Sequence, residues 1–178
     1  MSHVYPYRGI HPTLHASAFI APTASVIGDV HVGEESSVWY GTVIRGDVMP
    51  IRIGARTSIQ DNTVVHATGG WRETHVGDDC TIGHSVILHG CTVGSRVLIG
   101  MGSILLDAVE IGDDAMIGAG SLVTARTKIP AGMLAHGRPA KVIRPLNDEE
   151  RERIREAGEL YRRYGREHRE SIHGTWKP

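Results

Sequence analysis

The stretch that decides the fold is residues 91–129, CTVGSRVLIGMGSILLDAVEIGDDAMIGAGSLVTARTKI. An aliphatic residue recurs in it at every sixth position, at Val93, Ile99, Leu105, Ile111, Ile117, Val123 and Ile129. A constant short period indicates a short strand and a corner, repeated many times. One such strand cannot bury a face alone, but stacked turns bury the aliphatic column and pair their backbones about 4.8 Å apart.

The same ladder continues toward the N-terminus in three blocks that are offset from one another. Its members are Leu14, Ile20, Val26, Val32, Val38 and Ile44, then Ile53, Ile59 and Val65, then Val76, Ile82 and Leu88. Glycine follows many of them, as in Val32-Gly33 and Val93-Gly94, and we expect it to supply the positive φ that a tight corner needs. An antiparallel β-sandwich is the alternative, but so constant a period favours a parallel β-helix with three faces per turn.

The ladder ends at Ile129, and the chain changes character after it. We expect a β-helix over residues 1–130, a linker rich in Gly and Pro over 131–146, and an α-helix over 147–170, all in one structural domain. Asn147 and Glu150 have the spacing of a capping box. An apolar stripe that includes Ile154 and Tyr161 should pack on the flank of the β-helix, of the same chain or of a neighbouring one.

Composition excludes several classes of function. The formal net charge of the 178 residues is -1, so we expect no nucleic acid or anionic membrane surface as a partner. No run is apolar enough to span a bilayer, and residues 1–8 lack the apolar core of a signal peptide, so a cytoplasmic protein is expected. Cys80 and Cys91 are interpreted as buried thiols of the ladder, with zinc ligation as a weaker alternative.

The ladder also fixes which histidines meet. His66 comes one residue after Val65 and His89 one residue after Leu88, and these two ladder residues are three rungs, or one full turn, apart. The two imidazoles should therefore stack at about the spacing of neighbouring strands, close enough to bind one metal ion. Arg45, one residue after Ile44, belongs to the same column one turn earlier.

His84 behaves differently, because it comes two residues after Ile82. Side chains alternate along a strand, so His84 points away from the direction that His66 and His89 take. Within one chain it is hard to bring to the pair, whereas a neighbouring copy in a cyclic trimer could supply it. Asp61 shares the His84 column, one turn earlier.

These residues carry a resemblance to a known family. The chain resembles the γ-class carbonic anhydrases in Arg45-Gly46-Asp47, Gln60-Asp61-Asn62, His66, Gly83-His84 and His89-Gly90. Residues 137–141 (GRPAK) and 146–150 (LNDEE) resemble the bacterial branch of that family. The repeat resembles the hexapeptide motif of left-handed β-helices, so a left-handed coil is expected against the usual crossover preference. The ladder alone is less specific, because acyltransferases share it.

The resemblance implies a homotrimer with three sites between chains. His66 and His89 of one chain and His84 of the next would bind zinc, with iron or cobalt as alternatives. Three histidines and an open position are the catalytic arrangement for zinc. The metal would lower the pKa of bound water to about 7, and the resulting hydroxide would hydrate CO2 reversibly to bicarbonate.

The resemblance also assigns roles to other residues. Gln60 would orient the hydroxide, Asp61 would support a ligand or handle protons, and Tyr161 would lie near the metal. Arg45 and Asp47 would form an ion pair across the trimer interface.

The chain departs from the most active family members near the first histidine. The loop of residues 67–75 is short, and Glu73 is its only carboxylate and therefore the candidate proton shuttle. Val48 stands where the archetype has a glutamate. Since proton export can limit hydration, these differences bear on the rate rather than on metal binding.

Two other classes of function remain open at this point. One is an enzyme acting on CoA thioesters, either an acyltransferase or a hydrolase that uses the same metal site. The other is a weakly active, metal-binding scaffold trimer.

Overall fold

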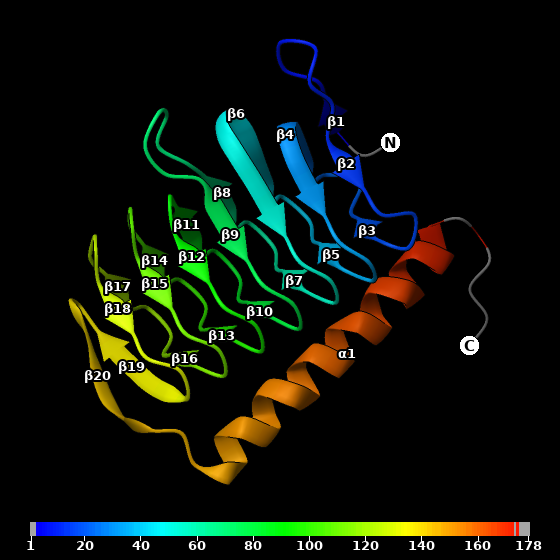
Figure 1. Cartoon of the computed structure of the whole chain (residues 1–178). Coiled ribbons are helices and arrows are strands. Elements are labelled where there is room, and N and C mark those ends of the chain that lie inside the picture. Colours follow the sequence, from blue (N-terminus) through cyan, green and yellow to red (C-terminus); the bar gives the residue numbers. More distant parts are fainter. Residues whose placement is uncertain (1–2, 173, 175–178) are drawn as a thin grey trace.

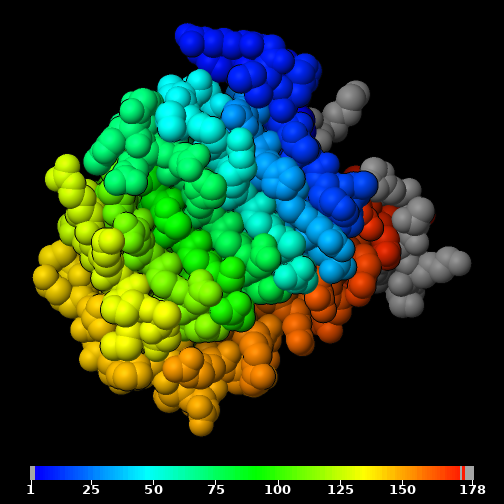
Figure 2. Space-filling model, viewed as in Figure 1, coloured from blue at the N-terminus to red at the C-terminus, as the bar shows by residue number. Residues whose placement is uncertain are grey.

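The computed structural model describes residues 3–172 and residue 174, so residues 1 and 2 of the predicted β-helix segment lie outside it. The chain forms a left-handed parallel β-helix of about 7 turns, with one helix, α1 (Asp148–Ile172), along its side (Figure 1). The fold class predicted from the ladder is confirmed. In the space-filling view the turns pack against one another without a break, and the N-terminal segment, in blue, projects at the top (Figure 2).

Each turn contributes strands to three faces. The first face holds β1 (His3–Tyr5), the start of β4 (Ser25–Val32), the start of β6 (Val43–Ile53), β8 (Val64–His66), β11 (Ile87–His89), β14 (Ile104–Leu105) and β17 (Leu122–Val123). The second face holds β2 (Thr13–Leu14), the ends of β4 and β6, β9 (Thr74–Val76), β12 (Thr92–Val93), β15 (Glu110–Ile111) and β18 (Lys128–Ile129). The third face holds β3 (Phe19–Ile20), β5 (Ser37–Val38), β7 (Ser58–Ile59), β10 (Thr81–Ile82), β13 (Leu98–Ile99), β16 (Met116–Ile117) and β19 (Met133–Gly137).

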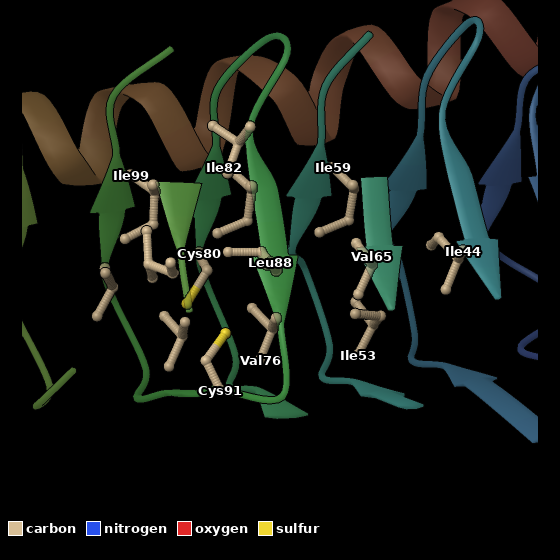
Figure 3. Packing of buried hydrophobic residues seen from close by; sticks show 14 of the residues in the cluster. Ile44, Ile53, Ile59, Val65, Val76, Cys80, Ile82, Leu88, Cys91 and Ile99 are labelled. Atoms are coloured by element: carbon tan, nitrogen blue, oxygen red, sulfur yellow. The ribbon is translucent and has the colours of Figure 1, made fainter. Parts of the chain in front are cut away.

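The aliphatic ladder forms the core of the prism. Ile59 pairs with Ile82, and Val65 with Leu88, in successive turns, and all four side chains are buried. Figure 3 shows these residues pointing into the interior together with Cys80 and Cys91. The six-residue period therefore corresponds to one inward-pointing side chain on each face of each turn, as predicted.

Most ladder glycines serve a purpose other than the one predicted. Gly33 and Gly94 do not have positive φ, so the expectation of a left-handed conformation is wrong for them. The positive φ of these corners falls two residues later, for example 57° at Arg96. A Cβ on Gly94 would instead lie 2.8 Å from the backbone N of Asp113 in the next turn. These glycines allow close approach of stacked turns.

Residues 131–146, expected as a linker, contain two strands. β19 pairs with β16 and completes the last turn, and β20 (Ala140–Pro145) folds back on β19 in antiparallel orientation. The physical reason is the open end of the solenoid, where the edge of the last turn would otherwise leave its backbone groups unpaired. Leu146, which follows, is buried with Met116 and Ile154.

The C-terminal helix begins and packs as its sequence indicates. The capping box is confirmed, since the Glu150 N–H donates to Asn147 Oδ1 at 2.8 Å and the Asn147 N–H donates to Glu150 Oε2 at 3.0 Å. The helix ends at Ile172 and lies on the third face of its own chain, where it contacts β3, β5, β7 and β10. Near its end the His168 ring lies 5.0 Å from the Trp39 ring. None of the helices in the described part of the chain is long and apolar enough to cross a bilayer.

The outward side chains differ sharply between the two faces that α1 leaves uncovered. The second face is polar, with Arg52, His75, Thr92, Glu110 and Lys128 in register. The first face presents an aliphatic column, one residue before each ladder position: Val43, Val64, Ile87, Ile104 and Leu122. We call this column the outer stripe. Val64 and Ile87 are 40% and 37% exposed, so part of the stripe meets solvent in the single chain.

Candidate metal centre

The two histidines that the ladder predicts to stack are next to each other. His66 on β8 pairs in register with His89 on β11, and the Nδ1 atom of His66 lies 3.3 Å from the Nε2 atom of His89. Each side chain points outward from the first face, because the ladder residue before it points inward. The stacking inferred from the sequence is confirmed.

Each imidazole has a carboxylate on its other nitrogen. His66 Nε2 lies 3.0 Å from Asp47 Oδ1, and His89 Nδ1 lies 3.1 Å from Asp107 Oδ1. An ionised carboxylate only accepts hydrogen bonds, so both of these ring nitrogens are donors. The four side chains therefore form a row in the order Asp47, His66, His89, Asp107. In this row each histidine donates an N–H to the aspartate beside it.

This arrangement leaves the two inner nitrogens facing each other. In the neutral rings, His66 Nδ1 and His89 Nε2 both carry lone pairs, and at 3.3 Å two lone pairs repel. Either a shared proton or a cation between them removes the repulsion. Neutral imidazoles backed by carboxylates are the donors that zinc and similar divalent metals take in proteins. The residues present therefore fit a metal ion.

Arg45 and Asp47 form an ion pair within one chain. In the single chain the Arg45 guanidinium contacts Asp47, two residues along β6. An ion pair between these residues across a trimer interface stays a prediction. Burial alone would raise the pKa of the Asp47 carboxyl, but hydrogen bonds from His66 and Arg45 bring that pKa below its ordinary value. Asp47 therefore stays an acceptor for His66.

His84 lies at another corner of the prism, between the third and first faces. Its Nδ1 atom is 2.9 Å from Asp61 Oδ2, in the neighbouring turn, as the shared column predicts. The Nδ1–H of His84 thus points at the carboxylate, and its Nε2 is left with a free lone pair. Gln60, next to Asp61, is buried.

Tyr161 belongs to the same side of the molecule as His84. Its ring on α1 packs edge-on against Trp39 at 5.8 Å. Burial and the nearby Asp61 carboxylate raise the pKa of the Tyr161 phenol above its ordinary value. Tyr161 therefore lies beside the His84 corner and stays protonated at neutral pH.

The remaining candidates are separate from both groups. Glu73 contacts His75 Nε2 at 2.8 Å on the polar second face. Burial raises the pKa of Cys80 and of Cys91 to about 12, so both remain thiols. Within the residues that the structure describes, no three His, Cys, Asp or Glu side chains of one chain converge on a common point.

Sequence reasoning missed Asp107 and Thr68. Asp107 comes two residues after Leu105, which pairs with Leu88, so it lies one turn beyond Gly90. Extending the register by one more turn past His89 could have found it. Thr68 Oγ1 donates to the same Asp107 oxygen at 2.6 Å, and it belongs to a loop whose conformation the repeat does not specify.

Comparison with known proteins adds a second line of evidence. Residues 73–106 and 90–125 match the family described as "Bacterial transferase hexapeptide (six repeats)". The chain is 51% identical over 166 residues to "Carbonic anhydrase" of Geobacillus kaustophilus, covering 89% of this chain and 91% of that protein. It is 48% identical over 144 residues to "Gamma carbonic anhydrase 1, mitochondrial" of Arabidopsis thaliana. That match covers 78% of this chain, and the chain spans 52% of the Arabidopsis relative's length.

A solved structure shares the architecture over nearly its whole length. It is a hexapeptide transferase family protein from Anaplasma phagocytophilum, 44% identical, with a TM-score of 0.89. The match covers 93% of this chain and 97% of that one.

Proposed function

This chain belongs to the γ carbonic anhydrase family of hexapeptide-repeat proteins, and from that premise we propose that it is a metal-dependent enzyme that hydrates CO2 reversibly to bicarbonate. The row Asp47, His66, His89, Asp107 is the single observation that carries the proposal. Its two inner nitrogens face each other at 3.3 Å with lone pairs that only a proton or a cation can share. We propose zinc as the cation, with iron or cobalt as alternatives.

The third ligand in this proposal is His84 of a neighbouring copy. His84 is a carboxylate-backed imidazole like the other two, with Asp61 in the role of Asp47 and Asp107. It lies at the corner that leads into the first face, where His66 and His89 also point outward. The outer stripe on that face is apolar and partly exposed, as expected of a surface that a second copy covers. A cyclic trimer would form three equivalent sites.

The residues around the proposed metal have separate roles in this proposal. A bound divalent metal supplies Lewis acidity and lowers the pKa of a coordinated water to about 7. Asp47, Asp61 and Asp107 fix which nitrogen of each histidine carries the proton, so that the other nitrogen is free to bind. Gln60, buried beside Asp61, is proposed to orient the attacking water.

Two residues are proposed to handle the proton that hydration releases. Tyr161 keeps its proton because its pKa is raised, so we propose a hydrogen-bonding role for it near the site rather than a role as a base. Glu73 is retained as the proposed shuttle, although His75 holds its carboxylate on the second face. A cytoplasmic location likewise stays a proposal.

A complementation experiment tests the shared site. Two differently tagged variants, His84→Ala and His66→Ala, are expressed separately and together, and the mixed species is purified through both tags. Each variant alone should bind little zinc, because every interface lacks a ligand. Each mixed trimer should regain one complete site, since one of its interfaces joins an intact pair to an intact His84.

The readouts are the metal content by elemental analysis, the assembly by native mass spectrometry and the CO2 hydration rate by stopped flow on zinc and iron forms. Full metal loading of His84→Ala alone would rule out the third ligand. A mixed trimer without recovered metal would rule out sharing between chains. A metal-loaded wild-type protein without CO2 hydration would rule out the proposed reaction.

A second function has a specific observation in its favour. A groove of about 600 Å³ lies on the second face beside the loop, lined by residues that include Arg72, Thr92, Glu110 and Lys128. The structurally similar Anaplasma protein is described as a hexapeptide transferase family member. Transfer or hydrolysis of a CoA thioester is therefore the alternative, and turnover of acetyl-CoA by a protein inactive toward CO2 would favour it. A metal-binding scaffold trimer remains if both assays are negative.

A further inference from the structure

We propose that Asp107 is a positioning residue for the metal ligand His89, and that Thr68 connects the loop of residues 67–73 to that ligand through it. The inference rests on the proposed function only in treating His89 as a ligand. Asp107 lies outside the sequence motifs named above, on which the resemblance to the γ carbonic anhydrases rests.

The contacts of Asp107 define its role. Its Oδ1 atom lies 3.1 Å from His89 Nδ1 and accepts a hydrogen bond of 2.6 Å from Thr68 Oγ1. Both partners donate to the same oxygen, so the carboxylate can be only an acceptor toward His89. The proton of His89 is thereby kept on Nδ1, and Nε2 presents its lone pair to His66.

The fold makes a notch for this carboxylate. Gly90 lies one turn below Asp107, and a Cβ on Gly90 would collide with Asp107 Oδ1. Gly90 also has a φ of 57°, a backbone conformation that favours glycine. The backbone of Asp107 is held in turn, because its carbonyl accepts from the Arg126 N–H at 2.9 Å. The position of Asp107 is therefore set by the solenoid rather than by a flexible contact.

The loop above is fixed to the same turns. The Thr68 carbonyl accepts a hydrogen bond of 3.0 Å from the Arg72 N–H, and this bond closes the loop on itself. The Arg126 guanidinium lies over the Trp71 ring, 5.7 Å from its centroid. Thr68 and Trp71 thus hold the loop against the neighbouring turns, at the corner between the first and second faces. A shift of the loop would therefore act on His89 through Asp107.

The test compares two aspartates in similar surroundings. Asp107→Asn weakens the acceptor and allows the amide to donate, which permits the wrong histidine tautomer. Asp113→Asn is the matched control, because Asp113 also fills a glycine notch, at Gly94, but contacts Ser95 and Arg96 instead of a histidine. Zinc affinity is measured by competition with a chelator. We expect a loss of about 10–100-fold for Asp107→Asn and wild-type affinity for Asp113→Asn.

Two further measurements separate positioning from general damage. In the zinc-loaded wild type, ¹⁵N NMR should show His89 protonated at Nδ1, and this signal should weaken or move in Asp107→Asn. Thr68→Val should weaken zinc binding less than Asp107→Asn does, and Thr68→Ser should restore it, since serine keeps the hydroxyl.

The outcomes are distinguishable from failure of the proposed function. Zinc binding that depends on Asp107 in a protein without CO2 hydration would support this inference and overturn only the reaction. Wild-type zinc affinity in Asp107→Asn, or an equal loss in Asp113→Asn, would overturn the inference. A wild-type protein that binds no zinc would overturn both.

Discussion

Leu88 and Ile87 are neighbours in the sequence with opposite surroundings. Leu88 points into the core between Val65 and Leu105, directly before the proposed ligand His89, and is fully buried. Leu88→Ala should lower the free energy of unfolding by about 2–5 kcal/mol, because stacked turns on either side limit collapse of the cavity. Denaturant unfolding monitored by circular dichroism measures it. Leu88→Met, which keeps the volume, should cost less than about 1.5 kcal/mol.

Gly94 tests the explanation of the ladder glycines by close approach. A methyl group there would meet the backbone of the next turn, so Gly94→Ala should destabilise the fold by about 1–3 kcal/mol. Gly158→Ala is the control, because Gly158 is inside α1 and its nearest atom is 3.9 Å away. That substitution should stabilise by about 0.5–1 kcal/mol. Equal effects in thermal unfolding would contradict the explanation.

At the scale of residues, the sequence predicts well which residues pair between turns, but it predicts poorly how the histidine rings are oriented. Counting along the ladder places His66 against His89 and Asp61 against His84, because parallel pairing fixes which residues share a column. The ring orientations depend on hydrogen-bond partners such as Asp107, which no motif marks. The register also cannot place Thr68, since its loop has no repeat to follow.

The start of α1 links pH to stability. Hydrogen bonds from the Arg144 guanidinium and the Asn147 N–H lower the pKa of Glu150 from 4.5 to about 2. A depressed folded-state pKa stabilises the fold above pH 4.5, and this stabilisation is lost as the pH falls through about 2. The melting temperature of Glu150→Gln should therefore lie below that of the wild type at pH 6, and the difference should shrink toward pH 2.

Glu149→Gln provides the comparison, because Glu149 is more exposed than Glu150 and forms a longer ion pair, with Arg153 at 3.5 Å. Its effect on the melting temperature should be small at every pH. A Glu150→Gln difference that stays constant from pH 6 to pH 2 would show that the capping box, rather than the charge, is responsible.

Among the elements, the helix was predictable and the last hairpin was not. The capping box and the apolar stripe are local signals, so the start of α1 and its packing face could be inferred. Residues 131–146 contain Gly and Pro, which usually mark a linker. Strand β19 forms there because β16 offers a free edge, and that edge exists only once the preceding turns have folded.

For the whole molecule, the outer stripe predicts how copies associate. Ile87→Asp places a charge in the middle of the stripe, so we expect a monomer with an intact fold and without bound metal. Analytical ultracentrifugation, circular dichroism and metal analysis measure these three properties. Thr92→Asp, on the polar second face, should leave all three unchanged. A trimeric Ile87→Asp variant would place the interface elsewhere.

The irregular steps of the ladder have a wider meaning. From Ile44 to Ile53, Val65 to Val76 and Leu88 to Val93 the chain crosses the same corner in nine, eleven and five residues instead of six. The stacking absorbs each difference, because Ile53 still pairs with Val76 and Val76 with Val93. This corner, beside His66 and His89, therefore tolerates loops of different length. Segments of different length can be exchanged there without changing the register of the turns that carry His66, His84 and His89.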